Sequence, residues 1–218
     1  MSLNTIESNL KDLQAEYSAK KTAIKKRLED FKKVWLESEK IIFSELCFCI
    51  CTPQSNAIYA DRAIKNLIKN NALYSGSIQD IRASLKAVRF PNNKAGYIYL
   101  ARDIFSRNGK ISIKKKINTL DIFSARLWLV KNIKGLGFKE ASHFLRNIGF
   151  GKNLAILDIH ILRRMKNYGL IIDIPKSISK RLYFELEEKL RFFCGKVGIP
   201  MAELDLLFWS SATGEIFK

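Results

Sequence analysis

Apolar residues recur at steps of three, four or seven over the first 35 residues, from Leu3 to Trp35. That spacing is typical of one face of an α-helix, so the segment predicts one long amphipathic helix or two shorter ones. The segment IIFSELCFCICT at 41–52 is apolar on nearly all sides and ends before Pro53, which predicts a buried helix. Further helical patterns lie at about 56–70, 77–88, 92–107, 121–134, 138–148, 157–168, 178–197 and 201–212.

Strand-like alternation occurs in one short segment, KISIKKKI at 110–117, which we interpret as a connection or a stray strand. The surrounding stretch 107–121 is rich in lysine, and we expect it to form a hinge or an exposed loop with solvated charges. Because only four prolines and eleven glycines interrupt 218 residues, the pattern predicts an essentially all-α fold. The length suits one compact body in one lobe or two.

The balance of charge narrows the choice of partner. The chain carries 38 Lys and Arg against 21 Asp and Glu, a formal net charge of +17, and its pI is near 9.8. A field of this sign attracts polyanions, so nucleic acid is the favoured partner, although a lysine-rich surface can also serve solubility alone. The first residues are polar and no long apolar run follows, so we expect a cytoplasmic protein with no membrane partner.

The cysteines indicate packing rather than metal binding. Cys47, Cys49 and Cys51 alternate along an apolar run, and Cys194 stands alone. Zinc and iron–sulfur sites usually need a C-x2-C pair with a second pair downstream, which this spacing does not supply. The sequence therefore predicts reduced, buried thiols and no metal site.

Gly135 and Gly137 flank a leucine between two helical patterns, in VKNIKGLGFKEASHFLRNIGF. Glycine tolerates positive φ and has no Cβ to obstruct a close partner, so the pair predicts a tight hairpin between two short helices. The second helix would start with open N–H groups and the positive end of its dipole, which together bind an anion such as a phosphate. With Lys134 adding charge, the hairpin could hold a DNA backbone without reading its sequence.

Two residues near the hairpin are candidates for chemistry. Lys139 follows the turn, and Asp158 leads into the next helical pattern in LAILDIHILRRM. A lysine at such a place is commonly one more phosphate contact, and an aspartate before a helix is commonly its N-cap. The residues alone leave a structural and a catalytic role open for both.

A family resemblance favours the catalytic role. Gly135, Gly137 and Ala141 are spaced as in the helix-hairpin-helix element of DNA repair and replication proteins. The segments VKNIKGLGFKEASHFLRNIG, AILDIHIL and ELDLLFWSSATGEIFK resemble the archaeal and bacterial second family of 8-oxoguanine DNA glycosylase/AP lyases, and ELCFCICT and VRFPNNKAGYIYLAR extend the likeness. The resemblance implies one unit, residues 1–218, in two helical lobes with the hairpin, at about 126–148, at the cleft.

The same resemblance implies an activity on double-stranded DNA that contains 8-oxoguanine. The damaged nucleotide would be turned out of the duplex. Lys139 would attack the sugar C1′ as a neutral amine and form a Schiff base, through which the strand is then cut. Asp158 would stabilise the positive charge that develops on the sugar. No cofactor is required, and we expect a monomer that associates with the nucleoid when it binds DNA.

The resemblance also assigns a base pocket. Phe90 and Trp209 would stack on the extruded base, which contributes about 1–3 kcal/mol with little discrimination. Lys218, with the terminal carboxylate, would enter the same pocket. The alternatives are that both aromatic residues belong to the core and that Lys218 is part of a frayed terminus.

Two further residues are expected to meet the DNA. His143 lies one helical turn after Lys139, and its family counterpart lies near the active site and the DNA backbone; a packed histidine is the alternative. Gln54 stands where relatives place a residue that fills the gap left by the extruded base or meets the opposite base. The family usually has asparagine there, and a basic residue where this chain has Ile159, so the opposite-base preference and one backbone contact stay open.

Two other functions remain as alternatives. The chain could be a glycosylase for another oxidised base, since the hairpin and the chemistry of Lys139 and Asp158 would be unchanged. It could instead be a noncatalytic DNA-binding module that uses the hairpin as a clamp. The sequence also leaves open whether carbonyl groups of the hairpin bind a structural monovalent cation.

Overall fold

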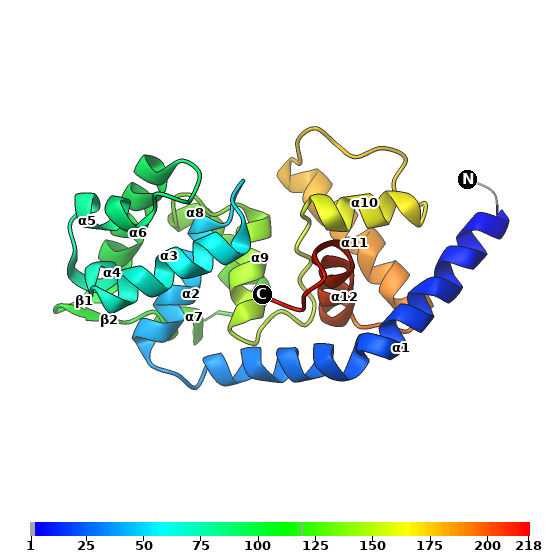
Figure 1. The fold of residues 1–218 in the computed structure, drawn as a ribbon, viewed down its shortest axis with the longest axis horizontal. Coiled ribbons are helices and arrows are strands. Elements are labelled where there is room, and N and C mark those ends of the chain that lie inside the picture. Colours follow the sequence, from blue (N-terminus) through cyan, green and yellow to red (C-terminus); the bar gives the residue numbers. More distant parts are fainter. Residues whose placement is uncertain (1–2, 119) are drawn as a thin grey trace. The chain divides into compact units, whose positions relative to one another are not determined.

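The computed structural model describes residues 3–118 and 120–218, with side chains from residue 9 onward. Helices make up nearly all of its regular structure, so the predicted all-α fold is confirmed (Figure 1). The chain forms two compact units: one is Lys33–Phe150, and the other joins the N-terminal segment up to Lys32 with Gly151–Lys218. No helix in the described part of the chain is both long and apolar enough to cross a membrane.

The Lys33–Phe150 unit is built around helix α2 (Glu39–Cys51), the buried helix that the apolar run predicts. Phe43 and Leu46 on this helix are fully buried, and α2 contacts α3, α6 and α9. Ser38 caps the start of α2 by accepting a hydrogen bond from the Ile41 amide at 3.4 Å. The other helices of the unit are α3 (Ala57–Lys69), α4 (Ala72–Ser75), α5 (Ile78–Ser84), α6 (Pro91–Phe105), α7 (Lys114–Asn118), α8 (Ile122–Asn132) and α9 (Phe138–Asn147).

The lysine-rich stretch after α6 is more ordered than its pattern predicts. Strands β1 (Ser106–Arg107) and β2 (Lys110–Ile111) pair antiparallel, and helix α7 follows at once. The stray strand expected at 110–117 is present as β2, and residues 107–110 are exposed as expected. The expected loop is wrong over 114–118, because Ile113 and Ile117 are four residues apart and both are buried, which anchors α7. The Nζ atom of Lys116 lies 4.7 Å from the centroid of the Trp128 ring, so this charge is not simply solvated.

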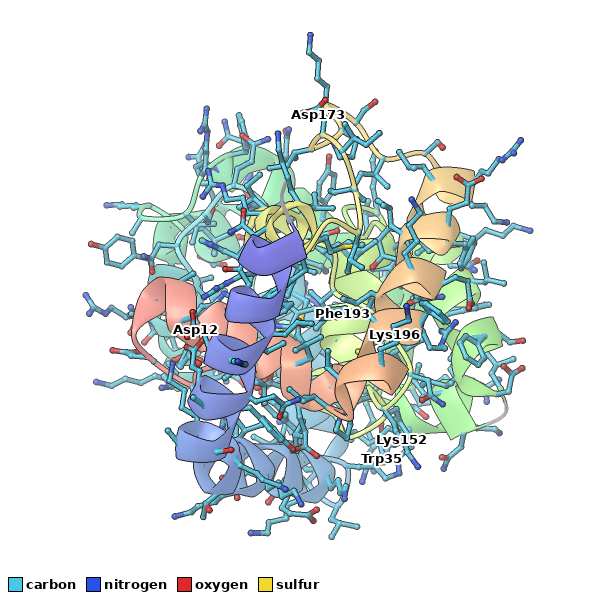
Figure 2. All side chains as sticks on the ribbon, turned by 90° about the vertical axis from the view of Figure 1, so that its right-hand side faces the viewer. Asp12, Trp35, Lys152, Asp173, Phe193 and Lys196 are labelled. Atoms are coloured by element: carbon cyan, nitrogen blue, oxygen red, sulfur yellow. The ribbon has the colours of Figure 1, made fainter. Side chains whose placement is uncertain are left out.

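The other unit holds α1 (Leu3–Val34), which runs on into the neighbouring unit, and α10 (Ile159–Asn167), α11 (Lys180–Val197) and α12 (Met201–Thr213). Helix α12 contacts both α10 and α11. Phe193 lies on α11 (Figure 2), and its ring centroid is 5.2 Å from that of Tyr168. The Tyr17 hydroxyl donates a hydrogen bond of 2.6 Å to Glu203 Oε2, which ties α1 to α12.

The four cysteines are reduced thiols outside any disulfide of the described residues, and all four are buried, as their apolar surroundings predict. Burial raises the pKa of the Cys51 thiol to about 12 and that of the Cys194 thiol to about 12. Thiols that stay protonated in this way are poor nucleophiles and poor metal ligands. They contribute to packing.

Candidate active site and nucleic-acid interface

The predicted hairpin joins α8 to α9. Its first helix, α8, begins at Ile122, a few residues before the start expected at about 126. Ile133 and Leu136 point into the protein and are 1% and 6% exposed. The Leu136 amide donates to the Ile133 carbonyl at 3.2 Å, which closes the turn. Lys134, Gly135 and Gly137 are left exposed on its outer side. The turn therefore presents glycine backbone and a positive charge to a partner, as a phosphate contact requires.

The two glycines of the turn are needed for different reasons. Gly135 has φ +89°, and a Cβ there would lie 2.4 Å from Cδ2 of Tyr97. Both the left-handed backbone and the tight contact require glycine. Gly137 has φ −90°, which any residue adopts, and a Cβ there would lie 3.1 Å from Glu140 Oε2. The expectation of positive φ thus holds for the first glycine, while the second mainly leaves room for a carboxylate.

Lys139 lies in the first turn of α9, and its side chain is 26% exposed. Its Nζ atom forms an ion pair of 3.0 Å with Glu140 Oε1. The other carboxylate oxygen, Oε2, accepts a hydrogen bond of 3.2 Å from the Gly137 amide. Glu140 was not among the predicted site residues, although a glutamate three residues after an N-cap is the position that closes a capping box.

A cavity of about 140 Å³ in the same unit brings three predicted site residues together. Gln54, Phe90 and Gly135 all line it. Gln54 and Phe90 have φ of +54° and +57°, and Phe90 is 48% exposed. Left-handed backbone at residues other than glycine is strained and concentrates at functional sites, and an aromatic ring this exposed is not a core residue. Ile50, Pro53, Asn93, Lys94 and Tyr97 complete the lining.

Lys94 is a further residue of this region that the sequence did not indicate. It is 4% exposed, and its Nζ donates to the carbonyl oxygens of Cys51 and Pro53, each at 2.7 Å, and to Ser55 Oγ at 3.0 Å. These bonds fix the turn that carries Gln54. Burial lowers the pKa of Lys94, and the charge of Lys139 lowers it further, while Cys51 and Glu140 act in the opposite direction.

Asp158 belongs to the other unit and is the N-cap of α10. Its Oδ1 accepts a hydrogen bond of 2.9 Å from the Ile161 amide, which fixes the carboxylate at the helix start. The capping role considered from the sequence is therefore confirmed. It leaves the second carboxylate oxygen available for another task.

The C-terminal segment of the same unit is held in place. The rings of Trp209 and Phe217 stack with centroids 6.3 Å apart. Arg27 Nε donates a hydrogen bond of 2.7 Å to the Phe217 carbonyl oxygen. Lys218 is thus next to an anchored residue, so the alternative of a frayed terminus does not describe this segment. Trp209 is only half-buried and belongs to a surface, not to the core.

His143 takes the packed alternative. It is 7% exposed, and its ring meets that of Phe48 edge-on at 5.6 Å and 79°. A side chain in this position contributes to the contact between α9 and α2. Within the described residues, no group of three or more His, Cys, Asp or Glu side chains is arranged to hold a metal ion.

These features define a class of protein. An all-α chain of high positive charge presents a glycine hairpin to solvent, places a lysine at the start of the second hairpin helix, and carries a capped aspartate at the next helix. That combination is the helix-hairpin-helix class of DNA-binding proteins, in the form that carries a lysine and an aspartate.

Comparison with known proteins identifies the family. A sequence model described as 8-oxoguanine DNA glycosylase matches residues 24–199, and the chain belongs to this family. An 8-oxoguanine DNA glycosylase/AP lyase of Fusobacterium nucleatum is 46% identical over 217 residues, which cover 99% of this chain and 97% of that protein.

Solved structures agree with the sequence comparison. The crystal structure of the 8-oxoguanine DNA glycosylase of Methanocaldococcus jannaschii has a TM-score of 0.86 and 36% identity, covering 97% of each chain. A structure of the M. jannaschii 8-oxoguanine glycosylase/lyase in complex with a 15mer DNA containing 8-oxoguanine has a TM-score of 0.87 and 35% identity, covering 97% of this chain and 100% of that one.

Proposed function

We propose that this protein is a bifunctional DNA glycosylase and AP lyase that removes 8-oxoguanine from double-stranded DNA and then cuts the strand. The observation that carries the proposal is the 46% identity to an 8-oxoguanine DNA glycosylase/AP lyase over 99% of the chain. The site supports it, because Lys139 lies directly after an exposed glycine hairpin in a chain of net charge +17.

The hairpin has the task of holding the DNA backbone. The amides around Gly135 and Gly137 and the ammonium of Lys134 receive a phosphate, with no contact to base edges. Turning a nucleotide out of the stack costs a few kcal/mol, which these phosphate contacts offset. The flipped nucleotide then exposes its C1′ atom.

Lys139 carries the bond-forming step. Its amine nitrogen attacks C1′ while the glycosidic bond breaks, and the oxidised base leaves with the bonding pair and takes up a proton. The sugar ring opens to a Schiff base on the lysine. Loss of a C2′ proton and of the 3′ phosphate then cuts the strand by β-elimination, and water releases the enzyme.

Asp158 has an electrostatic task. As C1′ becomes electron-deficient, a nearby carboxylate lowers the energy of the transition state. Its hydrogen bond to the Ile161 amide fixes its direction in advance, so little reorganisation is needed during the reaction.

Phe90 and Trp209 are the two aromatic side chains that we assign to the base. Phe90 offers an exposed ring beside the cavity that Gln54 also lines, and Trp209 offers its ring next to the anchored C-terminal residues. We assign Gln54 to the gap or the opposite base, because it is exposed and its strained backbone is held by the turn that Lys94 fixes. Lys218 is assigned to the oxidised base.

Borohydride trapping tests this function. A duplex with 8-oxoguanine is incubated with the protein and sodium borohydride, which reduces a Schiff base to a stable covalent adduct. The wild type should give an adduct and a cleaved strand, and Lys139→Gln should give neither while it still binds the duplex. An unreactive wild type would leave only a DNA clamp, and an equal adduct in Lys139→Gln would move the nucleophile to another residue.

A lesion panel tests the substrate. Single-turnover cleavage is compared for duplexes that carry 8-oxoguanine, an oxidised pyrimidine or unmodified guanine at one position. Faster cleavage at 8-oxoguanine supports the proposed substrate. Preference for the pyrimidine lesion would keep the chemistry of Lys139 and change the substrate class.

A further inference from the structure

The carboxylate of Glu140 makes two contacts at the start of α9. Oε1 pairs with the Lys139 ammonium at 3.0 Å, and Oε2 accepts from the Gly137 amide at 3.2 Å. The Glu140 side chain is 12% exposed and that of Lys139 is 26% exposed. One side chain thus joins the turn glycine to the candidate nucleophile.

The ion pair fixes the direction of the lysine side chain. Adjacent residues on a helix project about 100° apart, so they do not meet unless one side chain bends across the surface. Contact between Lys139 and Glu140 therefore requires the lysine to fold over the first turn of α9. The amine is held beside Gly137, where the phosphate-binding backbone also lies.

Other charged side chains around α9 are engaged elsewhere. From α8, Arg126 donates to Ser142 Oγ at 3.2 Å, and from α2, Glu45 accepts from Asn147 Nδ2 at 3.1 Å. Both contacts lie further along the helix than the first turn. His143 is packed against Phe48.

One more cation acts on the start of α9. The buried Lys94 on α6 is close enough for the charge of Lys139 to lower its pKa, after the larger effect of burial, and for the charge of Glu140 to act against this. Lys94 Nζ itself donates to the carbonyl oxygens of Cys51 and Pro53.

We propose that Glu140 is a positioning residue for Lys139, whose carboxylate holds the amine over the first turn of α9. The proposal rests on the assignment of Lys139 as the nucleophile. Attack on C1′ requires the amine nitrogen to approach from one direction, and the contact with Glu140 sets that direction before the reaction.

The variant Glu140→Gln separates positioning of the amine from a purely structural role. Its amide oxygen can still accept from the Gly137 amide, so the helix start keeps its cap, while the negative charge is lost. The trapping rate is measured over a range of duplex concentrations, so that the rate at saturation and the half-saturating concentration are obtained separately. The duplex already contains an abasic site, which removes base excision from the readout. Thermal unfolding of each variant is followed in parallel.

We expect one change in Glu140→Gln. The trapping rate at saturating duplex falls about threefold to tenfold, because the amine is no longer held in one direction, while the half-saturating duplex concentration stays near the wild-type value. Glu140→Asp keeps the charge on a shorter side chain, so its rate at saturation also falls.

Each result decides the matter. A rate at saturation in Glu140→Gln that equals the wild-type rate, or a weaker affinity for the duplex as the only change, overturns the proposal. If Glu140→Gln does not fold, Glu140→Asp still tests it, because a wild-type rate at saturation would show that the reach of the carboxylate is irrelevant. An adduct that persists in Lys139→Gln would instead remove the proposed nucleophile, which is a different failure.

Discussion

The two helices that carry the proposed chemistry start in opposite ways. Helix α10 is capped by Asp158 itself, whose Oδ1 accepts from the Ile161 amide at 2.9 Å. Helix α9 starts at Gly137, which has no side chain to cap it, and the glycine amide is taken up by Glu140. The carboxylate of Asp158 is thus fixed by its own backbone, whereas the amine of Lys139 is fixed by a neighbouring side chain.

This difference matches the two roles. A group that stabilises charge works best when it is already oriented, so a backbone hydrogen bond suits Asp158. A group that attacks has to reach C1′ as the bond forms, and a contact with a flexible side chain, which directs the amine without locking it, suits Lys139. The bare start of α9 also leaves backbone N–H groups for the phosphate.

The largest expected effect concerns Asp158, whose carboxylate is fixed by the backbone of α10. In Asp158→Asn the side chain can still cap α10, since asparagine and aspartate are similar N-caps, so thermal unfolding should change little. Loss of the charge should slow release of 8-oxoguanine about 100-fold or more, measured in single turnovers. Asp158→Ala is the matched control, because it also loses the cap and should cost about 1 kcal/mol of stability. Wild-type base release in Asp158→Asn would reduce Asp158 to a cap.

The turn before α9 gives the next effect. Gly135→Ala places a Cβ on left-handed backbone 2.4 Å from Tyr97 Cδ2, and we expect a loss of about 2–4 kcal/mol in the free energy of unfolding. Gly137→Ala keeps an ordinary φ and meets only a movable carboxylate at 3.1 Å, so its cost should stay within about 1 kcal/mol. Urea unfolding of both variants measures the difference. Equal losses would contradict the assignment of strain to the first glycine.

Substitution of Lys94 tests the buried hydrogen bonds that fix the turn carrying Gln54. Lys94→Met keeps most of the volume but leaves the acceptors of Cys51, Pro53 and Ser55 without their donor, which should cost about 1–3 kcal/mol of stability. The turn that carries Gln54 should loosen, so the ratio of cleavage rates with different bases opposite the lesion should approach one. An unchanged ratio would separate Lys94 from the placement of Gln54. Lys94→Arg is the control that keeps the charge.

Local patterns predicted most of these features, and distant contacts supplied the rest. The buried α2, the hairpin and the cap at Asp158 all follow from spacing within a few residues. Helix α7 was missed because the alternating KISI at 110–113 and the three consecutive lysines at 114–116 obscure the four-residue spacing of Ile113 and Ile117. Lys94 could not be found, since its partners lie about forty residues away in the chain.

The site shows the same division between local and distant information. Gly135 was identified from its neighbours, but its reason, the contact with Tyr97, depends on how α6 packs against the turn. Glu140 carried a local signal, three residues after Gly137, that the pattern of glycines and lysines obscured. The burial of His143 against Phe48 depends on packing between α9 and α2, which no local pattern encodes.

The smallest expected effect concerns the support of α10, which packs against α12 as α9 packs against α2. The hydrogen bond from Tyr17 to Glu203 joins α1 to α12, and its loss in Tyr17→Phe should cost about 1–2 kcal/mol at neutral pH. Burial raises the pKa of Tyr17 to about 12 from an ordinary value of 10.0. Between these values the folded protein keeps a proton that the unfolded chain has lost, so this contribution to stability falls as pH rises.

Tyr17→Phe lacks that proton, so its free energy of unfolding should decline less than that of the wild type across this window. Tyr74 and the buried thiols also titrate high, but they are common to both proteins and cancel in the difference. Chemical unfolding at neutral pH and across the alkaline range measures it. Parallel declines would contradict the raised pKa of Tyr17 in the folded protein. A difference in the free energy of unfolding between the two proteins that shrinks as pH rises would show that the contact of α1 with α12, on which α10 packs, depends on the Tyr17 proton. Helix α9 packs instead on the apolar helix α2.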